Sequence, residues 1–280
     1  MGDAMILVTG ATGNVGSELA RALAEAGVSA RALTRDPAAA TLPRGVEAVA
    51  GDLNRPETLT GALEGVRGIF LLPGYEDMPG MLERARQAGV ERVVLLSGGS
   101  AALQDMNNAV SRYMTLAERA VRESGLSWTF LRPRAFMSNA LRWLPQLRTG
   151  DEVRVPFPEV PVAAIDPYDI AAVAAQALLT DGHDGQIHEL TGPESLLPAD
   201  QVAILAKALG RDLHFRGLTN AEARAEMSQD MPVEYVDAFF SFYVDGALDE
   251  STVHPTVREV TGREPRTFEQ WARTHADEFK

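Results

Sequence analysis

The sequence predicts an α/β fold with a doubly wound parallel sheet and a smaller, mainly helical C-terminal lobe. Apolar runs without polar alternation, typical of strands covered on both faces, alternate with stretches of helical period. A glycine-rich turn joins the first such run to the first helical stretch. From Pro198 onward the strand-like runs stop and helical periodicity dominates. Strands and helices that alternate in this way favour right-handed crossovers and a parallel sheet.

The N-terminal half supplies the strands of this sheet. Residues 5–8 form the first strand-like run, and the helical repeat that follows from Val15 ends at Gly27, a residue suited to a left-handed helix cap. Further strands are predicted at 30–34, 46–50, 68–72, 90–96 and 128–131, and helices at 57–63, 78–88 and 108–123.

The rhythm changes after Pro133, where several prolines precede a helix predicted at 169–179. We expect a Rossmann-type domain of residues 1–134 plus 161–194 and a substrate lobe of residues 135–160 plus 195–280. The pattern gives this lobe no sheet of its own. Its predicted helices are 202–209, 221–227, 233–244 and 268–279.

The amino-acid composition excludes several classes of function. The 280 residues contain no cysteine, which excludes disulfides, thiolate nucleophiles and cysteine-bound metals. A net charge of −13 argues against a nucleic-acid partner. No run approaches the ~20 apolar residues of a membrane span, and Met1–Met5 lacks the basic start of a secretory signal, so a cytoplasmic location is expected.

The glycine-rich turn reads Thr-Gly-Ala-Thr-Gly-Asn-Val-Gly from Thr9 to Gly16. In such a turn the first glycine permits the bend, the second lets the backbone approach a pyrophosphate, and the third allows close packing of helix and strand. The alternative is a connector without a ligand. The position between a strand and a helix favours a dinucleotide, with contacts predicted from Gly10, Thr12, Gly13, Asn14, Val15 and Gly16.

The end of the second strand indicates which dinucleotide is bound. An acidic residue there bonds a ribose hydroxyl, whereas an arginine accommodates a 2′-phosphate. Arg35 and Thr34 are predicted to bind that phosphate, which favours NADP(H). Alternatively, Arg35 is an exposed turn residue and Asp36 contacts the ribose. Arg31 is a less favoured contributor.

Two further strand ends carry predicted cofactor contacts. Asp52 is expected to bond the adenine amino group and Leu53 to pack on the ring. The alternative for Asp52 is that it satisfies its own loop. Leu72 and Pro73 follow the fourth strand at the same edge of the sheet.

Several segments together resemble the NmrA-like family of atypical short-chain dehydrogenase/reductases. They are TGATGNVG at 9–16, TRDP at 34–37, GDL at 51–53, VVLLSGGS at 93–100, ERAVRESGLSWTFLRPRAFMSN at 118–139, IDPYDIAAVAAQAL at 165–178 and ELTGPESLLPADQVAILAKALGR at 189–211. The resemblance implies an NADP(H)-binding Rossmann domain with a small C-terminal lobe. Family members are either reductases or redox-sensing regulators.

One departure from the wider superfamily concerns catalysis. Its Tyr-x-x-x-Lys pair, in which the lysine lowers the tyrosine pKa, would fall at Val110 and Met114. Ser97 matches the family's catalytic serine and is predicted to contact substrate and cofactor, or alternatively to satisfy a strand end. Tyr113 is a second catalytic candidate, although a packed or exposed tyrosine is the alternative.

The resemblance also suggests where a substrate lies. Pro133 and Phe136 match positions beside the nicotinamide, and the pocket is predicted to include Phe136, Met137, Asn139 and Trp143. Phe136 and Trp143 are equally consistent with core packing. Phe240 and Tyr243 share a helix face that can cover a flat ligand, while Tyr235, Phe239 and Phe242 form a core stripe.

Without the tyrosine-lysine pair, hydride transfer requires a substrate whose carbonyl is already activated. The sequence therefore predicts an NADPH-dependent reductase of a quinone or polycyclic aromatic ketone, such as a ketoreductase that tailors an aromatic polyketide like an angucyclinone. The alternative is a binding protein that senses NADP(H) and reports to a regulatory partner. The five histidines show no metal-ligand spacing, so no metal site is expected.

Overall fold

The computed structural model describes residues 5–279. The first four residues, which belong to the Met1–Met5 segment considered above, and Lys280 lie outside the described part. The chain forms two compact units. Among the described residues, the first comprises 5–101, 113–133 and 167–189, and the second 102–112, 134–166 and 190–279. Residues 102–112, 134, 161–166 and 190–194 thus belong to the second unit, whereas we expected them in the cofactor domain.

A seven-stranded sheet forms the centre of the first unit, in the order β3-β2-β1-β4-β5-β6-β8. Neighbouring strands from β3 to β6 pair in parallel. The order reverses at β1, whose neighbours are β2 and β4, and open α/β sheets bind ligands beyond the strand ends at such a point. The strands are β1 (Met5–Val8), β2 (Ala30–Thr34), β3 (Val46–Ala50), β4 (Val66–Leu71), β5 (Arg92–Leu96), β6 (Ser127–Pro133) and β8 (Gln186–Leu190).

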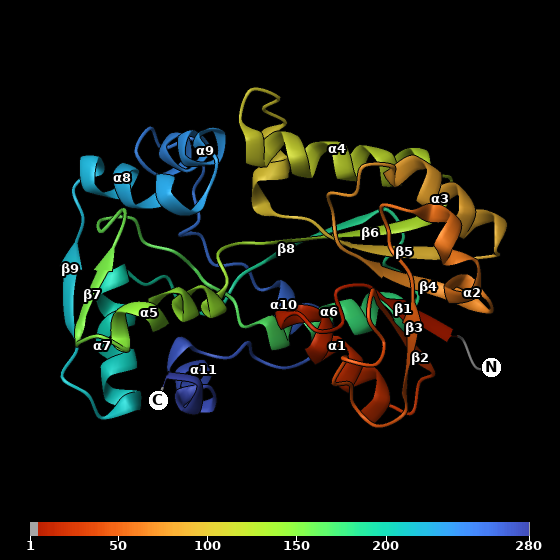
Figure 1. Ribbon diagram of the computed structural model, residues 1–280, viewed down its shortest axis with the longest axis horizontal. Coiled ribbons are helices and arrows are strands. Elements are labelled where there is room, and N and C mark those ends of the chain that lie inside the picture. The colour runs from red at the N-terminus through yellow and green to blue at the C-terminus, as the bar shows by residue number, and fades with distance from the viewer. Residues whose placement is uncertain (1–4, 280) are drawn as a thin grey trace. The chain divides into compact units, whose positions relative to one another are not determined.

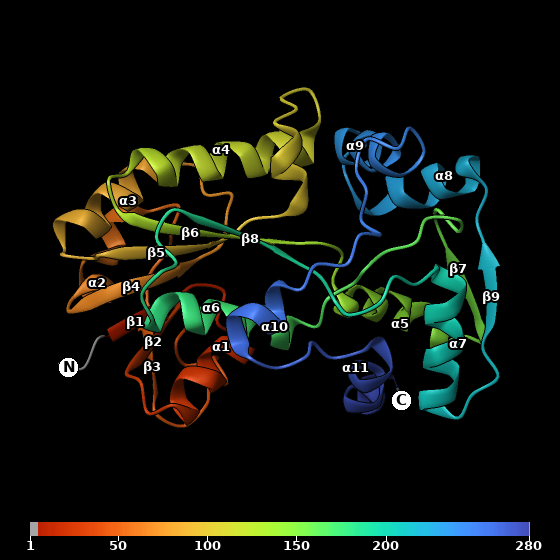
Figure 2. The ribbon, with the colours of Figure 1, turned by 180° about the vertical axis from the view of Figure 1, so that it is seen from behind.

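Helices cover both faces of this sheet, which explains its apolar strands. Ile6, Leu7 and Val8 are each at most 1% exposed, so strand β1 is covered on both sides. In Figures 1 and 2, α1 and α6 lie on one face, and α3 and α4 on the other. The helices of the first unit are α1 (Asn14–Glu25), η1 (Pro56–Leu59), α2 (Thr60–Leu63), α3 (Met78–Gln87), η2 (Gly99–Leu103), α4 (Ala109–Glu123) and α6 (Pro167–Leu179), of which η2 and α4 continue into the second unit.

The second unit has its own apolar core. Trp271 is fully buried, lies 5.4 Å from Phe268 between ring centroids and stacks on His275 at 4.8 Å. Its helix packs against α7. The helices of this unit are η3 (Met137–Trp143), α5 (Leu144–Leu147), α7 (Pro198–Leu209), α8 (Asn220–Asp230), α9 (Val233–Tyr243), α10 (Thr256–Thr261), α11 (Phe268–Thr274) and η4 (Ala276–Phe279).

The expectation that this unit has no sheet was wrong. Strands β7 (Glu152–Val155) and β9 (His214–Gly217) pair in parallel, with Val153 opposite Phe215. Both strands are four residues long, and the partner lies sixty residues away, so neither shows a local period. Strand β8 and helix α10 were also not predicted. None of the described helices is long and apolar enough to cross a membrane.

Candidate active site

The glycine-rich turn has the close backbone packing that its spacing predicts. Gly10 has a φ of +60°, in the left-handed region that favours glycine. The Gly13 N–H donates to the Gly10 carbonyl oxygen at 2.9 Å. A Cβ added at Gly16 would overlap that same carbonyl. Only glycine at Gly16 therefore lets the first turn of α1 approach the end of β1.

The start of α1 is open to an anion. Gly13 is the N-cap residue, and it has no side chain to accept hydrogen bonds from the first N–H groups of the helix. Asn14, Val15 and Gly16 form the first turn, with Val15 and Gly16 buried. The N–H groups at a helix start attract phosphate groups, so this end of α1 suits a pyrophosphate.

A cavity of about 680 Å³ adjoins this turn, and we call it the turn cavity. It brings together six residues that the sequence predicted as cofactor contacts: Gly10, Thr12, Thr34, Arg35, Asp52 and Leu53. Leu72 is close by, since its N–H donates to the Thr9 hydroxyl oxygen at 3.0 Å. The binding roles of all these residues remain predictions.

The contacts of Asp36 favour Arg35 as the residue that selects the cofactor. One Asp36 carboxylate oxygen accepts the N–H groups of Ala38 and Ala39 at 3.1 and 3.3 Å, so Asp36 caps its own loop. Arg31 is engaged elsewhere, because its guanidinium bonds Glu47 and carbonyl oxygens around α2. Arg35 is exposed at the cavity wall, where its guanidinium can reach a phosphate.

Two further features of the turn cavity involve its loops. Asp52 accepts the Asn54 N–H at 3.0 Å, as the alternative for this residue predicted, and it also lines the cavity. Tyr75 was missed. Tyr75 follows the glycine after β4, and its hydrogen-bond partner, Thr9, is distant in the sequence. Burial raises the pKa of Tyr75 to about 12, and the nearby Tyr113 adds to the increase. Tyr75 therefore stays protonated and offers a donor at neutral pH.

Ser97 is bonded inside the unit. Its hydroxyl donates to a Glu118 carboxylate oxygen at 2.7 Å, and both residues are buried. The Arg132 guanidinium donates to both oxygens of Glu118 at 2.8 Å. The partner of Ser97 is thus a buried ion pair and not a strand-end backbone group. Its catalytic and cofactor roles remain predictions that these contacts do not favour.

Tyr113 also has a partner within the protein. Its hydroxyl donates to the Pro73 carbonyl oxygen at 2.8 Å, and its ring packs so closely on Gly74 that a Cβ there would overlap it. Gly74 has a φ of +94°, which itself favours glycine. This packing agrees with the alternative of a packed tyrosine, and the predicted catalytic role stays untested.

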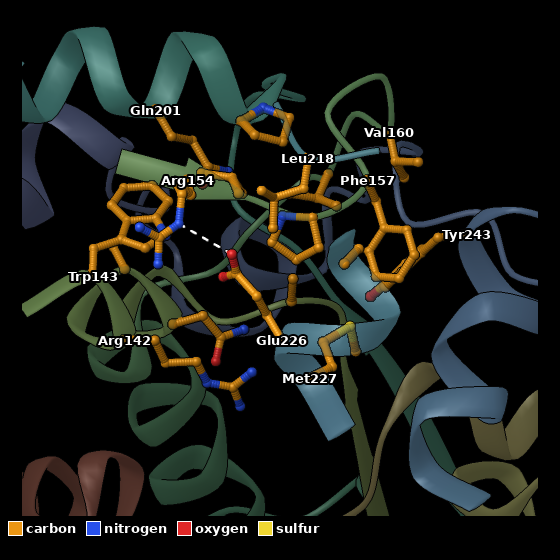
Figure 3. A pocket seen from close by; sticks show the side chains of 18 of the residues that line it. Arg142, Trp143, Arg154, Phe157, Val160, Gln201, Leu218, Glu226, Met227 and Tyr243 are labelled. Carbon is orange, nitrogen blue, oxygen red and sulfur yellow. Dashed lines mark hydrogen bonds and ion pairs between the residues drawn. The ribbon is translucent and has the colours of Figure 1, made fainter. Parts of the chain in front are cut away.

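A second cavity lies wholly within the second unit, with a volume of about 320 Å³, and we call it the lobe cavity. Four residues predicted to bind substrate line it: Phe136, Asn139, Trp143 and Tyr243. Figure 3 shows Trp143 and Arg142 on one side and Phe157 and Tyr243 on the other. Its wall thus combines flat aromatic rings with charged and amide groups.

The polar wall includes an ion pair. Arg154 Nε lies 3.1 Å from Glu226 Oε1, between the two aromatic sides in the view of Figure 3. Phe157 has a φ of +55°, an unusual value for a residue with a side chain. In this conformation its ring lines the lobe cavity. Phe157, Arg154 and Glu226 were not predicted, because Glu226 is more than sixty residues from the other two in the sequence and no local pattern links them.

Two other predicted substrate contacts do not line the lobe cavity. Met137 is 1% exposed and belongs to the apolar core of the unit. Phe240 packs its ring edge against Phe157, with centroids 5.2 Å apart, and the Arg224 guanidinium lies 4.2 Å above it. Both residues therefore support the wall from behind. Pro133 ends β6 in the first unit, whereas Phe136 pairs with Ile165 in the second.

Two of the five histidines lie side by side in the first unit. His183 Nδ1 and His188 Nε2 are 3.0 Å apart. Burial lowers the pKa of both rings. The positive charge of Arg92 lowers the pKa of His183 further, and the His183 ring does the same for His188. Within the described residues, no three histidine, aspartate or glutamate side chains are grouped to hold a metal ion.

The parallel sheet, the glycine turn and the cavity beside it define a Rossmann-type nucleotide-binding protein. The model of the NmrA-like family matches residues 2–272. The chain therefore belongs to that family.

Named relatives give the class of activity. A (4-alkanoyl-5-oxo-2,5-dihydrofuran-3-yl)methyl phosphate reductase of Streptomyces griseus is 41% identical, over 98% of this chain and 99% of the relative. An NAD(P)H azoreductase of Xenophilus azovorans is 39% identical, over 98% and 99%. The NADPH complex of an Escherichia coli quinone oxidoreductase has the same fold, with a TM-score of 0.77, 23% identity and 96% and 98% coverage. The protein is accordingly an oxidoreductase.

The buried ion pair beside Ser97 gives a stability prediction. Glu118→Ala leaves the buried Arg132 guanidinium with only the more distant Glu189 carboxylate, at 3.4 Å, and breaking a buried pair costs about 3–5 kcal/mol. We expect the free energy of unfolding in urea to fall by that amount. Glu83→Ala is the control, because its carboxylate pairs with Arg86 on the surface, where an ion pair contributes little to stability. Equal losses for the two variants would contradict the structural role of Glu118.

Proposed function

We propose that the protein is an NADPH-dependent reductase that transfers hydride to the activated carbonyl of a quinone or polycyclic aromatic ketone. A ketoreductase that tailors an aromatic polyketide in the cytoplasm is the most specific form of this proposal. The observation that carries it is the open start of α1 behind the Gly10–Gly16 turn. That backbone suits a dinucleotide pyrophosphate, because no side chain caps the first N–H groups of the helix.

The turn cavity fits NADP(H). Gly10 and Thr12 adjoin the pyrophosphate position, Thr34 and Arg35 take the 2′-phosphate, and Asp52 and Leu53 hold the adenine. Tyr75 adds a protonated phenol to the same wall. The azoreductase relative uses NAD(P)H, which agrees with this cofactor. Bound there, NADPH supplies the hydride for reduction.

The lobe cavity supports a planar, conjugated substrate. Phe157, Tyr243 and Trp143 offer flat surfaces, while Arg142 and Gln201 offer donors to substrate oxygens. A volume of about 320 Å³ suits a small fused-ring system. The names of the azoreductase and quinone oxidoreductase indicate acceptors with extended conjugation in this family.

The alternative is a protein that senses NADP(H) without turnover. It agrees with the engaged hydroxyls of Ser97 and Tyr113. The reductase is favoured because the relatives at 39–41% identity over nearly the whole chain are reductases. The two proposals differ in whether a bound cofactor is consumed.

The deciding experiment mixes the protein with NADPH and a panel of naphthoquinones, hydroxylated anthraquinones and angucyclinone ketones. We expect the absorbance of the reduced nicotinamide to fall with at least one of them. NADPH binding without consumption across the panel would favour the sensor, and no binding of NADPH or NADP⁺ would contradict both.

A second prediction concerns Gly16. Gly16→Ala forces a Cβ against the Gly10 carbonyl, so we expect a stability loss of about 1–3 kcal/mol and weaker NADPH binding by calorimetry. Gly61→Ala in α2 is the matched control, since its Cβ meets no atom within 4 Å, and it should gain up to ~1 kcal/mol. Unchanged NADPH affinity in folded Gly16→Ala would argue against pyrophosphate binding at this turn.

Arg35 provides the third prediction. Arg35→Ala removes the proposed partner of the 2′-phosphate, and hydrogen bonds to charged groups contribute about 1.5–3 kcal/mol, so Kd for NADPH should rise about 10-fold to 100-fold. Kd for NADH should stay the same. Arg67→Ala is the control. Arg67 lies near the start of β4, at the other end of that strand from the turn cavity, and pairs with Glu91, so its loss should change neither Kd. If Arg35→Ala weakens NADH binding as much as NADPH binding, Arg35 does not select between the two cofactors.

A further inference from the structure

A buried pair of acidic groups lies at the wall of the lobe cavity. Tyr243, near the end of α9, lines the cavity, and its hydroxyl donates to Glu250 Oε2 at 2.6 Å. Glu250 is 8% exposed, and its backbone carbonyl accepts the Ala163 N–H at 2.7 Å. In Figure 3 the Tyr243 ring lies beside Phe157, with its hydroxyl oxygen toward Met227 and Glu226. The phenol thus lies between the cavity and a fixed carboxyl group.

The surroundings of this pair raise the pKa of both groups. Burial raises the pKa of Glu250, and the Asp249 carboxylate adds to the increase, while the Tyr243 hydroxyl and the Arg134 guanidinium oppose it. Burial also raises the pKa of Tyr243 well above its usual value, as does Glu250, whereas Arg142 lowers it. The pair therefore gains protons more readily than the same groups in water.

The protonation of Glu250 decides what the phenol can offer a ligand. A phenol has one proton to donate. With Glu250 ionised, that proton is committed to the carboxylate. With Glu250 protonated, the carboxyl group donates to the Tyr243 oxygen, and the phenol proton is free to bond an oxygen in the cavity.

We propose that Tyr243 is the catalytic proton donor to the substrate carbonyl in the lobe cavity, and that Glu250 behind it is the positioning residue that holds the replacement proton. This inference rests on the proposed reductase function. It gives the chain a proton source of a kind that Val110 and Met114, at the usual tyrosine and lysine positions, do not provide.

The step balances in protons and electrons. The carbonyl carbon receives a hydrogen with its electron pair from NADPH, and the C=O π electrons move to the oxygen. That oxygen forms a bond to the Tyr243 proton as the phenol O–H breaks. The Tyr243 oxygen takes the Glu250 proton in turn. The products are the alcohol, NADP⁺ and a Glu250 carboxylate, which regains a proton from water.

The first arm of the test measures ligand binding without cofactor. The probe is 2-methyl-1,4-naphthoquinone, and 2-methylnaphthalene is its counterpart without oxygen. Tyr243→Phe should weaken quinone binding by about 2-fold to 10-fold, the range for one neutral hydrogen bond, and leave 2-methylnaphthalene unaffected. Tyr235→Phe, on the same helix but away from the cavity, is the control and should bind both probes like the wild type.

The second variant tests Glu250 through pH. Because its pKa is raised, the wild-type protein should bind the quinone best at low pH and lose affinity as the pH rises through that pKa. In Glu250→Gln the amide can donate to the Tyr243 oxygen at every pH, so quinone affinity should stay high and the pH dependence should disappear. A merely structural role for Glu250 predicts no such flattening.

Turnover gives the third readout. Tyr243→Phe should lower kcat by about 10²-fold to 10⁴-fold with little change in Kd for NADPH, the usual effect of losing a general acid. Wild-type kcat in Tyr243→Phe, or equal quinone affinity of wild type and Tyr243→Phe at every pH, would overturn the inference. If the wild-type protein does not bind NADPH, that result counts against the proposed function. The quinone-binding measurements, which use no cofactor, then still test the roles of Tyr243 and Glu250.

Discussion

The structure of the first unit depends on how closely the start of α1 approaches the end of β1. Gly16 has no room for a side chain against the Gly10 carbonyl, and Gly10 itself has a positive φ. Their approach places the start of α1, which no side chain caps, directly after β1, the strand at which the order of the sheet reverses. The loops after β2, β3 and β4 then complete the wall of the turn cavity. A cofactor site follows from backbone packing before any specific side chain is considered.

The sheet could be predicted because its signals are local. Strands β1, β2 and β3 match the expected residues. The continuous apolar run of β1 is typical of a buried parallel strand, whereas β3, at the edge of the sheet, is only partly buried. Strands β7 and β9 could not be predicted, because each is four residues long and the partner is remote. Likewise, no local pattern announces β8, in which His188 and Glu189 stand beside one apolar end residue, Leu190.

The candidate sites divide in the same way. Gly10 and Thr12 belong to the glycine-rich turn, and Arg35 follows the second strand at the usual position, so the sequence predicts that they contact one cofactor. All three line the turn cavity. Ser97 was chosen by its place after β5, but its partner Glu118 comes from a helix twenty-one residues later and could not be read from spacing. Glu250 lies in a loop without periodicity, and it bonds Tyr243, seven residues earlier, and Ala163, from a distant segment. Pairings of this kind become visible only in three dimensions.

The parallel pairing of β7 with β9 bears on how the chain is made. The second unit comprises residues 102–112, 134–166 and 190–279, while α6 and most of β8, which lie between its last two segments in the sequence, complete the first unit. On the ribosome, β7 leaves the exit tunnel long before its partner has been synthesised. Neither unit is one continuous stretch of the gene, so exchanging the second unit between relatives requires three separate segments to be replaced together.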